Sequence, residues 1–238
     1  MAQPLALVAC CSVKRILPLL TAAVACLALG GTWAIPALAS APHGTLTSHE
    51  YALLSSAEAK LGTALRKAPV SWGGARAACH AVGSSTTLLE SERASCLTET
   101  QLYEGLADFP RQESSCGTSQ PHYDLCVLPL YTDLARDSKA LYYADTVEYQ
   151  QAAQRGLTGR CFDALANTTM QLGEQRDLAT TTEKLKADLQ LAIKVEEGKL
   201  PSSAITASQI NSDAKAFERD GHLVLDQSGP KLSVCPHQ

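Results

Sequence analysis

Six cysteines spread over residues 79–235 constrain the fold of this chain more than any other feature of its sequence. Three further cysteines lie before residue 27, in a segment that we expect to be removed, so the number left to pair is even. An even set of cysteines in a chain that leaves the cytoplasm indicates a disulfide framework, with about 2–4 kcal/mol of stability from each bridge. The cysteines concerned are Cys79, Cys96, Cys116, Cys126, Cys161 and Cys235.

The N-terminal segment, residues 1–39, has the layout of a secretory signal peptide. Lys14 and Arg15 form a short basic region, residues 16–29 are apolar, and a cleavage site of the A-x-A type ends at Ala39. We expect cleavage after Ala39, which would make the mature protein secreted or otherwise extracytoplasmic.

Two other interpretations of this segment stay open. Residues 16–39 are apolar enough to span a bilayer, and would anchor the chain in a membrane if they were retained. The tetrapeptide A-V-A-C ending at Cys26 resembles a lipobox, although the usual leucine is missing. Gly30, Gly31 and Pro36 would interrupt a spanning helix, and they favour cleavage.

The charge of the chain argues against two classes of partner. Removing Lys14 and Arg15 takes two positive charges from a net charge of −4 and leaves −6, and the remaining basic residues do not cluster. A nucleic-acid-binding surface needs a basic patch, and so does attraction to an anionic membrane. We therefore expect no nucleic-acid partner, and membrane association only if the N-terminal segment is retained.

Helical periodicity dominates the rest of the chain, with proline and glycine between the periodic segments. The predicted helices span residues 48–67, 72–82, 87–109, 129–155, 161–197 and 208–219. Pro110 is expected to end the third helix and Pro129 to lie in the first turn of the fourth. The expected fold is all-α, an up-and-down helical bundle of five or six helices stapled by three disulfides. We expect a flexible stretch at 40–46, then a single domain, 47–238, whose last residues, 222–238, form an extended tail.

The predicted helix 161–197 carries two apolar stripes, about 150° apart in a helical projection. Phe162, Leu165 and Leu172 lie on the first stripe, whereas Leu178 and Leu185 lie on the second. One straight helix cannot bury both stripes against one partner. We therefore predict a kink or break near Gly173, or a change of packing partner there.

The predicted elements favour one pairing of the six cysteines. Cys79 and Cys96 face each other in a helical hairpin, and Cys116 and Cys126 lie close enough in sequence to close a loop. That leaves Cys161, at the start of a helix, for Cys235 in the C-terminal tail.

No linear motif for catalysis or cofactor binding is present: the chain has no G-x-S-x-G, H-E-x-x-H, P-loop or G-x-G-x-x-G pattern. Cys79-His80 and the sequence C-P-H that begins at Cys235 lack the ligand spacing of a metal site. Secreted phospholipases A2 carry Asp after such a Cys-His pair, where this chain has Ala81. We expect no cofactor and no metal.

The predicted helix 129–155 carries the strongest candidate for a polar site, because Asp145 falls within an apolar arc beside Tyr142 and Tyr149. A buried carboxylate must be paired, hydrogen-bonded or protonated. Arg176 lies where the first apolar stripe of the next helix continues, so we predict that it pairs with Asp145. A purely structural hydrogen-bonded acid at a helix contact is the alternative.

The expected function is binding by a non-enzymatic exported domain, with an unidentified protein or small ligand as the partner. In helical content and disulfides the chain resembles, in a generic way, small secreted four-helix inhibitors such as those of pectin methylesterase and invertase. Two alternatives stay open: an enzyme with a dispersed site around Asp145, Glu148, Tyr142 and Tyr149, and a structural component of the cell envelope.

Overall fold

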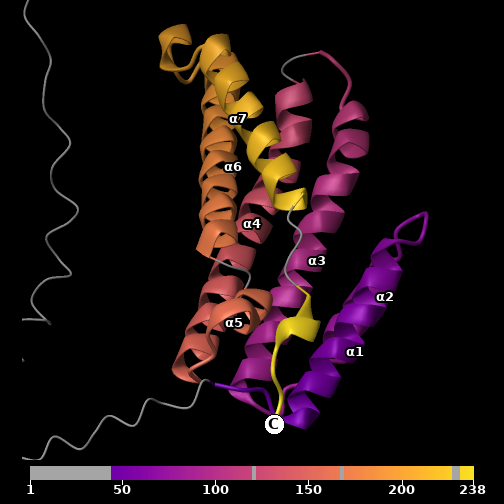
Figure 1. The fold of residues 1–238 in the computed structure, drawn as a ribbon. Coiled ribbons are helices and arrows are strands. Elements are labelled where there is room, and N and C mark those ends of the chain that lie inside the picture. The colour runs from indigo at the N-terminus through magenta and orange to yellow at the C-terminus, as the bar shows by residue number, and fades with distance from the viewer. Residues whose placement is uncertain (1–43, 120–121, 167–168, 227–230) are drawn as a thin grey trace, which may run out of the picture. The chain divides into compact units, whose positions relative to one another are not determined.

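The computed structural model of the chain describes residues 44–119, 122–166, 169–226 and 231–238. These residues form seven α-helices and two short 3₁₀ turns, so the all-α class is confirmed (Figure 1). The helices are α1 (Ser48–Leu65), α2 (Trp72–His80), α3 (Thr87–Ser114), α4 (His122–Gln154), α5 (Gly159–Leu165), α6 (Thr169–Glu196) and α7 (Ala207–Leu225). The turns are η2 (Ser202–Ala204) and η3 (Leu232–Val234). The predicted number of five or six helices was too low for this part of the chain.

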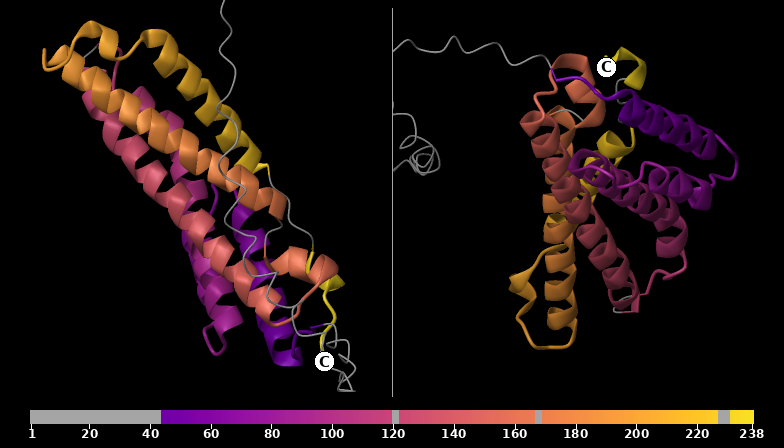
Figure 2. Two further views of the ribbon diagram at one scale, coloured as in Figure 1. Left: turned by 90° about the vertical axis from the view of Figure 1, so that its left-hand side faces the viewer. Right: turned by 90° about the horizontal axis from the view of Figure 1, so that it is seen from below.

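Four long helices, α3, α4, α6 and α7, run alternately up and down and pack side by side in that order (Figures 1 and 2). The hairpin of α1 and α2 packs against the N-terminal half of α3, and the short α5 lies beside α4 and η3. All the described residues belong to one compact unit. None of the described helices is long and apolar enough to span a membrane.

Hydroxyl side chains begin most of these helices by capping free backbone N–H groups. At α1, Thr47 and Glu50 form a capping box: the Thr47 hydroxyl accepts from the Glu50 N–H at 3.3 Å, and the Glu50 carboxylate accepts from the Thr47 N–H at 3.0 Å. Glu50 also forms an ion pair with Arg155, which follows α4. The cap therefore fixes both the start of α1 and its position against the end of α4.

Both prolines that were expected to bound helices lie inside them. Pro110 does not end α3, which continues to Ser114, and α4 begins at His122, well before Pro129. A proline in a helix interior removes one hydrogen bond and crowds the preceding turn, at a cost of about 3 kcal/mol. Phe109, just before Pro110, and Val127, two residues before Pro129, are buried in the same apolar cluster, and their packing keeps the chain helical.

The segment predicted as one helix from 161 to 197 is two helices. The chain breaks between the end of α5 at Leu165 and the start of α6 at Thr169, so the predicted position near Gly173 was wrong. Gly173 lies within α6, with nothing packed against the position that its Cβ would take. The predicted change of partner is present, because α5 packs on α4 and η3 whereas α6 packs on α4 and α7.

The first and last described residues are bound to each other and to the end of α4. Leu46 donates its N–H to the Pro236 carbonyl at 3.2 Å and accepts from the Gln238 N–H at 2.7 Å. Gly44 donates to the Gly156 carbonyl at 2.8 Å, and a Cβ at residue 44 would lie 2.5 Å from the carbonyl carbon of Gly156. Residues 44–46 of the predicted flexible stretch are therefore held by backbone hydrogen bonds.

The C-terminal segment differs from the extended tail predicted for 222–238. Helix α7 continues through Gly221 to Leu225, and the turn η3 follows near the C-terminus. Glycine is tolerated inside α7 because the helix packs against α3 and α6 on this side, where Gly221 and Val224 are buried.

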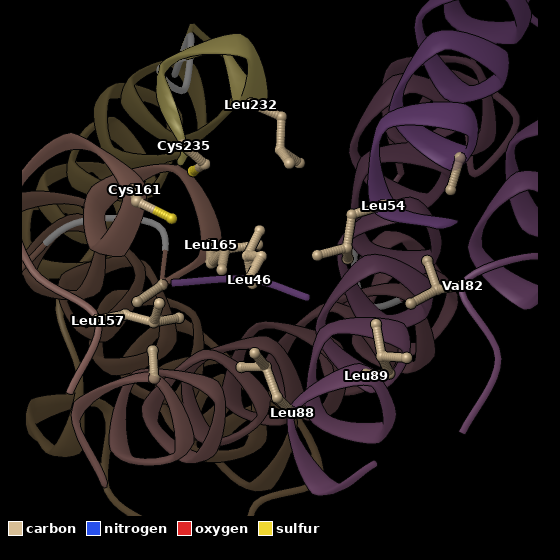
Figure 3. Close-up of a cluster of buried hydrophobic side chains, with 13 residues drawn as sticks. Leu46, Leu54, Val82, Leu88, Leu89, Leu157, Cys161, Leu165, Leu232 and Cys235 are labelled. Carbon is tan, nitrogen blue, oxygen red and sulfur yellow. The ribbon is translucent and has the colours of Figure 1, made fainter. Parts of the chain in front are cut away.

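Two disulfides follow the predicted pairing. Cys79–Cys96 joins α2 to α3 with a Cα–Cα distance of 5.5 Å, and Cys116–Cys126 joins the end of α3 to α4 at 5.6 Å. The third predicted bridge is not formed: Cys161 and Cys235 are free, buried thiols in hydrogen-bonding contact. Figure 3 shows the two sulfur atoms directed toward each other.

The apolar core is divided into two clusters. One surrounds α5, η3 and the adjoining ends of α1, α3 and α4, and contains Leu46, Leu54, Val82, Leu88, Leu89, Leu157, Leu165 and Leu232 (Figure 3). The other fills the four long helices and contains Leu102, Phe109, Val127, Tyr131, Leu134, Leu141, Leu178, Leu185, Phe217 and Val224. Both clusters draw on α3 and α4, which therefore connect them.

Candidate functional site

A layer of buried polar side chains separates the two apolar clusters. On α3, Leu89 belongs to the first cluster and Leu102 to the second, and Ser95 lies between them. The buried polar residues of α3, α4 and α6 in this region are Ser91, Ser95, Asp145, Glu148, Gln171 and Gln175. Glu92 and Glu99, one turn to either side of Ser95, are partly buried on the same face of α3.

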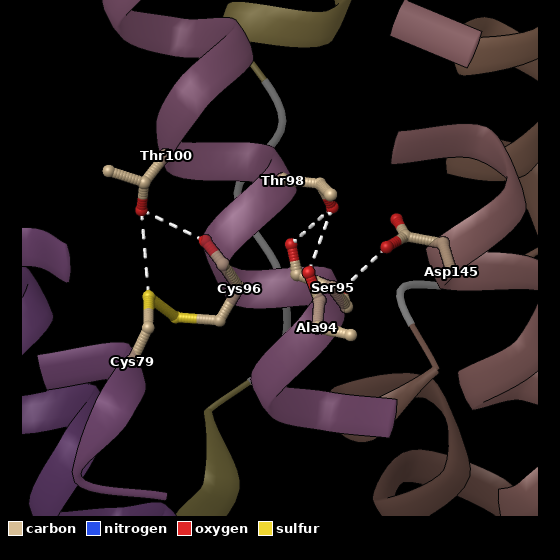
Figure 4. Close-up of a disulfide and its surroundings, with 7 residues drawn as sticks. All are labelled: Cys79, Ala94, Ser95, Cys96, Thr98, Thr100 and Asp145. Carbon is tan, nitrogen blue, oxygen red and sulfur yellow. Dashed lines mark hydrogen bonds between the residues drawn. A yellow bond between two sulfur atoms is a disulfide. The ribbon is translucent and has the colours of Figure 1, made fainter. Parts of the chain in front are cut away.

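Asp145 lies at the centre of this layer and is 0% exposed. Ser95 donates its hydroxyl to Oδ1 of Asp145 at 2.5 Å, and Gln175 donates Nε2 to Oδ2 at 2.6 Å. Figure 4 shows Ser95 reaching from α3 to Asp145 on α4. The alternative of a hydrogen-bonded acid at a helix contact agrees with these bonds.

The predicted pairing of Asp145 with Arg176 was wrong. Arg176 is exposed to solvent, and its guanidinium contacts the neighbouring Asp177 at 3.5 Å. The projection treated residues 161–197 as one helix, but the break between α5 and α6 changes the angular position of every later residue. Gln175, one residue earlier in α6, therefore occupies the position that we assigned to Arg176.

The other predicted site residues are only partly brought together. Glu148 is 1% exposed and faces Glu92 of α3, one turn from Asp145. Tyr149 packs edge-on against Phe162 of α5 at 4.6 Å between ring centroids, and Tyr142 is half-buried beside Tyr143 at 5.7 Å. The two tyrosines, predicted to lie beside the apolar arc, make ring contacts with Phe162 and Tyr143.

Sequence reasoning missed the α3 side of the layer. Glu92, Ser95 and Glu99 are spaced by three and four residues, which places them on one helical face. That spacing, in a helix that also carries a buried apolar stripe, could have been recognised in the sequence. It indicates a polar face directed at another helix.

Burial changes the acidity of this layer. It raises the pKa of Glu92 to about 7 and that of Glu99 to about 7, and the charge of Asp145 adds to both effects. Burial and then the negative charge of Glu92 raise the pKa of Glu148 well above its usual range. Glu92 and Glu148 hydrogen-bond to each other, so this pair shares a proton near neutral pH. No group of three or more His, Cys, Asp or Glu residues in the described part of the chain could hold a metal ion.

A cleft lies away from this layer, between α3 and α7, and its cavity volume is about 510 Å³. Three aromatic rings in mutual contact form its floor: Phe109 and Tyr131 at 4.9 Å, Phe109 and Phe217 at 5.6 Å, and Tyr131 and Phe217 at 5.3 Å. The polar residues along it are Glu113, Asn211, Lys215, Glu218 and His222.

Small residues on α7 make room for the cleft. Ala214, Phe217 and Gly221 lie on one face of the helix, so the large ring is flanked by positions with little or no side chain. A Cβ at Gly221 would be 3.7 Å from Leu106 of α3, which is ordinary contact. The Tyr103 hydroxyl donates to the Val224 carbonyl at 3.0 Å and holds the end of α7 against α3.

No protein family, curated protein or solved structure matches this chain. The polar layer and the α3–α7 cleft are therefore the features that bear on its function.

Two further hollows have a different chemical character. A groove of about 500 Å³ between α1 and α2 is lined by small and polar residues, among them Ser56, Lys60, Thr63, Lys67 and Gly74. A hollow of about 280 Å³ between α3 and α4 is lined by acids such as Glu104 and Asp137, which pair with Arg76 and Arg136. The α3–α7 cleft alone among these three combines an aromatic floor with a polar rim.

Proposed function

We propose that this chain is an exported binding module, and that the α3–α7 cleft takes a small ligand with an apolar body. The cleft volume of about 510 Å³ carries the proposal, because small-molecule sites in proteins typically measure about 300–1,000 Å³ and are lined mainly by apolar and aromatic side chains. The buried rings of Phe109, Tyr131 and Phe217 line the cleft and give it an apolar surface.

The rim of the cleft fits an amphipathic ligand. Lys215 and His222 of α7 can contact an anionic or hydrogen-bonding group, and Glu113 and Glu218 can contact a cationic one. The polar end of the ligand would stay at the surface, where these side chains are exposed, while its apolar part displaces water from the aromatic floor.

The test is a titration of the full-length protein with 1-anilinonaphthalene-8-sulfonate, an apolar fluorescent probe with one anionic group. We expect saturable binding at one site, weakened at least about tenfold by Ala214→Trp, because the indole fills the cleft beside Phe217. Ser212→Trp, at an exposed position of α7 outside the cleft, is the matched control and should leave the affinity within about twofold. Equal affinities in the two variants, with unchanged circular dichroism, would overturn the proposal.

We also propose that the protein is exported and that Cys161 and Cys235 form a third disulfide. The two formed disulfides support an oxidising compartment. The predicted signal peptide lies outside the described residues. N-terminal sequencing of protein recovered from outside the cytoplasm should begin at Ser40, whereas a sequence that begins at Met1 would indicate a retained membrane anchor.

An enzyme is the second candidate, and the acid pair of Glu92 and Glu148 beside Asp145 is the observation that favours it, since acid pairs that share a proton serve as acid–base catalysts. The linings of the three hollows described above include none of these residues. Hydrolase screening should therefore find no activity that Asp145→Ala and Glu148→Ala remove. An activity that both substitutions abolish in a folded protein would favour the enzyme instead.

A further inference from the structure

The buried polar atoms without partners share one property. In the described residues they are all oxygens of carboxyl or amide groups, which accept hydrogen bonds: Glu92 Oε2, Glu148 Oε1, Gln171 Oε1, Gln175 Oε1, Asp188 Oδ2 and Asp220 Oδ2. Four of the six belong to the layer between α3, α4 and α6. Because a buried acceptor without a donor destabilises the folded state, this layer lacks hydrogen-bond donors.

Acids also meet acids where the helices contact each other. Three pairs of carboxyl groups are in hydrogen-bonding contact, across α3–α4, α6–α7 and α4–α6: Glu92 with Glu148, Asp188 with Asp213, and Glu196 with Asp124. Two carboxyl groups can form a hydrogen bond only if one of them keeps its proton. The buried contact of Glu92 with Glu148 therefore depends on a bound proton.

The groups that face the layer do not neutralise it. The acidic groups that face it from other elements are Glu58 of α1 and Asp145 and Glu148 of α4. The remaining groups are neutral: Gln171 and Gln175 of α6, the Val224 carbonyl of α7 and the Cys235 thiol. Arg76 of α2 is paired with Glu104, and Lys184 of α6 donates to Asp213 at 2.7 Å. The recorded charges acting on Glu92 and Glu99 are all acidic.

One hydroxyl connects this layer to α7. Tyr103 hydrogen-bonds to Glu99 and also donates to the Val224 carbonyl at 3.0 Å. Burial, and then the charge of Glu99, raise the pKa of Tyr103, so the phenol keeps its single hydrogen. Protonated Glu99 can donate to the Tyr103 oxygen, which leaves that hydrogen for Val224. Ionised Glu99 has no hydrogen and competes for the hydrogen of Tyr103.

We propose that the polar layer of α3, α4 and α6 is a proton-binding site which, through Glu99 and Tyr103, controls the attachment of α7 to α3. Protonation completes the hydrogen bonds of the layer and fixes α7. Loss of the protons frees the end of α7, which is one wall of the cleft, so acidity regulates access to the ligand site. This last consequence alone rests on the proposed function.

The direction of the pH dependence follows from the acidity of Glu92 and Glu99. Because the pKa of each is raised from 4.5 to about 7, by burial first, their contribution to stability is complete below about pH 4.5 and is lost as the pH rises through about 7. Each proton involved changes the unfolding equilibrium constant about tenfold per pH unit in that range. The lowered pKa of Asp213 acts in the opposite direction at more acidic pH.

The experiment is hydrogen exchange of the full-length protein at pH 5.5 and pH 8, corrected for the intrinsic rates and read at the amides of residues 221–225. We expect protection of these amides to fall at least about tenfold at pH 8 in the wild type, in line with one released proton. Glu99→Gln, which carries hydrogens at both values, should keep the protection within about twofold, and Tyr103→Phe should lower it at both. Glu90→Gln, at an exposed position of the same helix, should behave as the wild type.

Unchanged protection in the wild type, or a pH dependence that survives in Glu99→Gln, would overturn the proton site. Thermal unfolding adds a second measurement: wild type should melt at a higher temperature at pH 5.5 than at pH 8, and Glu92→Gln should reduce that difference. The proposed ligand site is tested independently of the proton site. It fails if Ala214→Trp and Ser212→Trp bind the probe equally, whatever the hydrogen-exchange result.

Discussion

At the scale of single residues, Asp145 shows how a buried carboxylate is held by hydrogen bonds from neutral side chains. Its carboxylate accepts from Ser95 at 2.5 Å and from Gln175 at 2.6 Å, so neutral donors on two other helices replace the predicted arginine. A hydrogen bond to a charged group is worth about 1.5–3 kcal/mol. Asp145 therefore ties α3, α4 and α6 together at one point.

Asp145→Ala should destabilise the protein by at least about 2 kcal/mol at pH 5.5, because Ser95 and Gln175 would be left buried without their acceptor. Arg176→Ala should change the free energy of unfolding by no more than about 0.5 kcal/mol, since its side chain is solvated. Urea unfolding followed by circular dichroism measures both. Similar losses in the two variants would contradict the assignment of Gln175 as the partner.

At the scale of the helices, packing outweighs local signals. Pro110 and Pro129 were predicted as helix boundaries, yet each lies within a helix, and nearby apolar residues such as Phe109 and Val127 are buried in the core. The break between α5 and α6 shows the converse. It divides a segment that has no proline, and it falls within the first predicted stripe, between Leu165 and Leu172, rather than between the two stripes.

Pro129 is exposed and makes no evident packing contribution, so its replacement isolates the backbone effect. Pro129→Ala restores an N–H that can donate within α4, and we expect a gain of about 1 kcal/mol or more in the free energy of unfolding. Thr132→Ala, one turn later and also exposed, is the control. A loss of stability in Pro129→Ala would show that the proline fixes a bend that α4 requires.

At the scale of the whole described molecule, the first and last described segments meet at one end of the bundle. Leu46 and Gln238 hydrogen-bond to each other, and the thiols of Cys161 and Cys235 meet beside them. Oxidation of these thiols by a disulfide-bearing oxidant would form the Cys161–Cys235 bond and transfer two electrons and two protons to the oxidant, whose own disulfide becomes two thiols. The new bond would link α5 to the C-terminal segment. The result would be a covalent ring that includes α6 and α7.

Non-reducing peptide mapping of exported protein should find Cys161 joined to Cys235, along with the two bridges already described. Cys161→Ala with Cys235→Ala should then lower stability by about 2–4 kcal/mol in oxidised protein. Ser233→Ala, exposed in η3, serves as the control. Alkylation of both thiols in protein taken from an oxidising compartment would show that the pair remains reduced.

The sequence by itself determined the helical class, the approximate position of most helices, two disulfide pairs and the burial of Asp145. Each of these follows from local periodicity or from short sequence separation, which act before the chain has folded. Only the tertiary structure decided the partner of Asp145, the course of the helices through both prolines, and the cleft. These depend on the relative rotation of helices such as α6 and α7, and a break of a few residues changes that rotation while leaving the periodicity on either side intact.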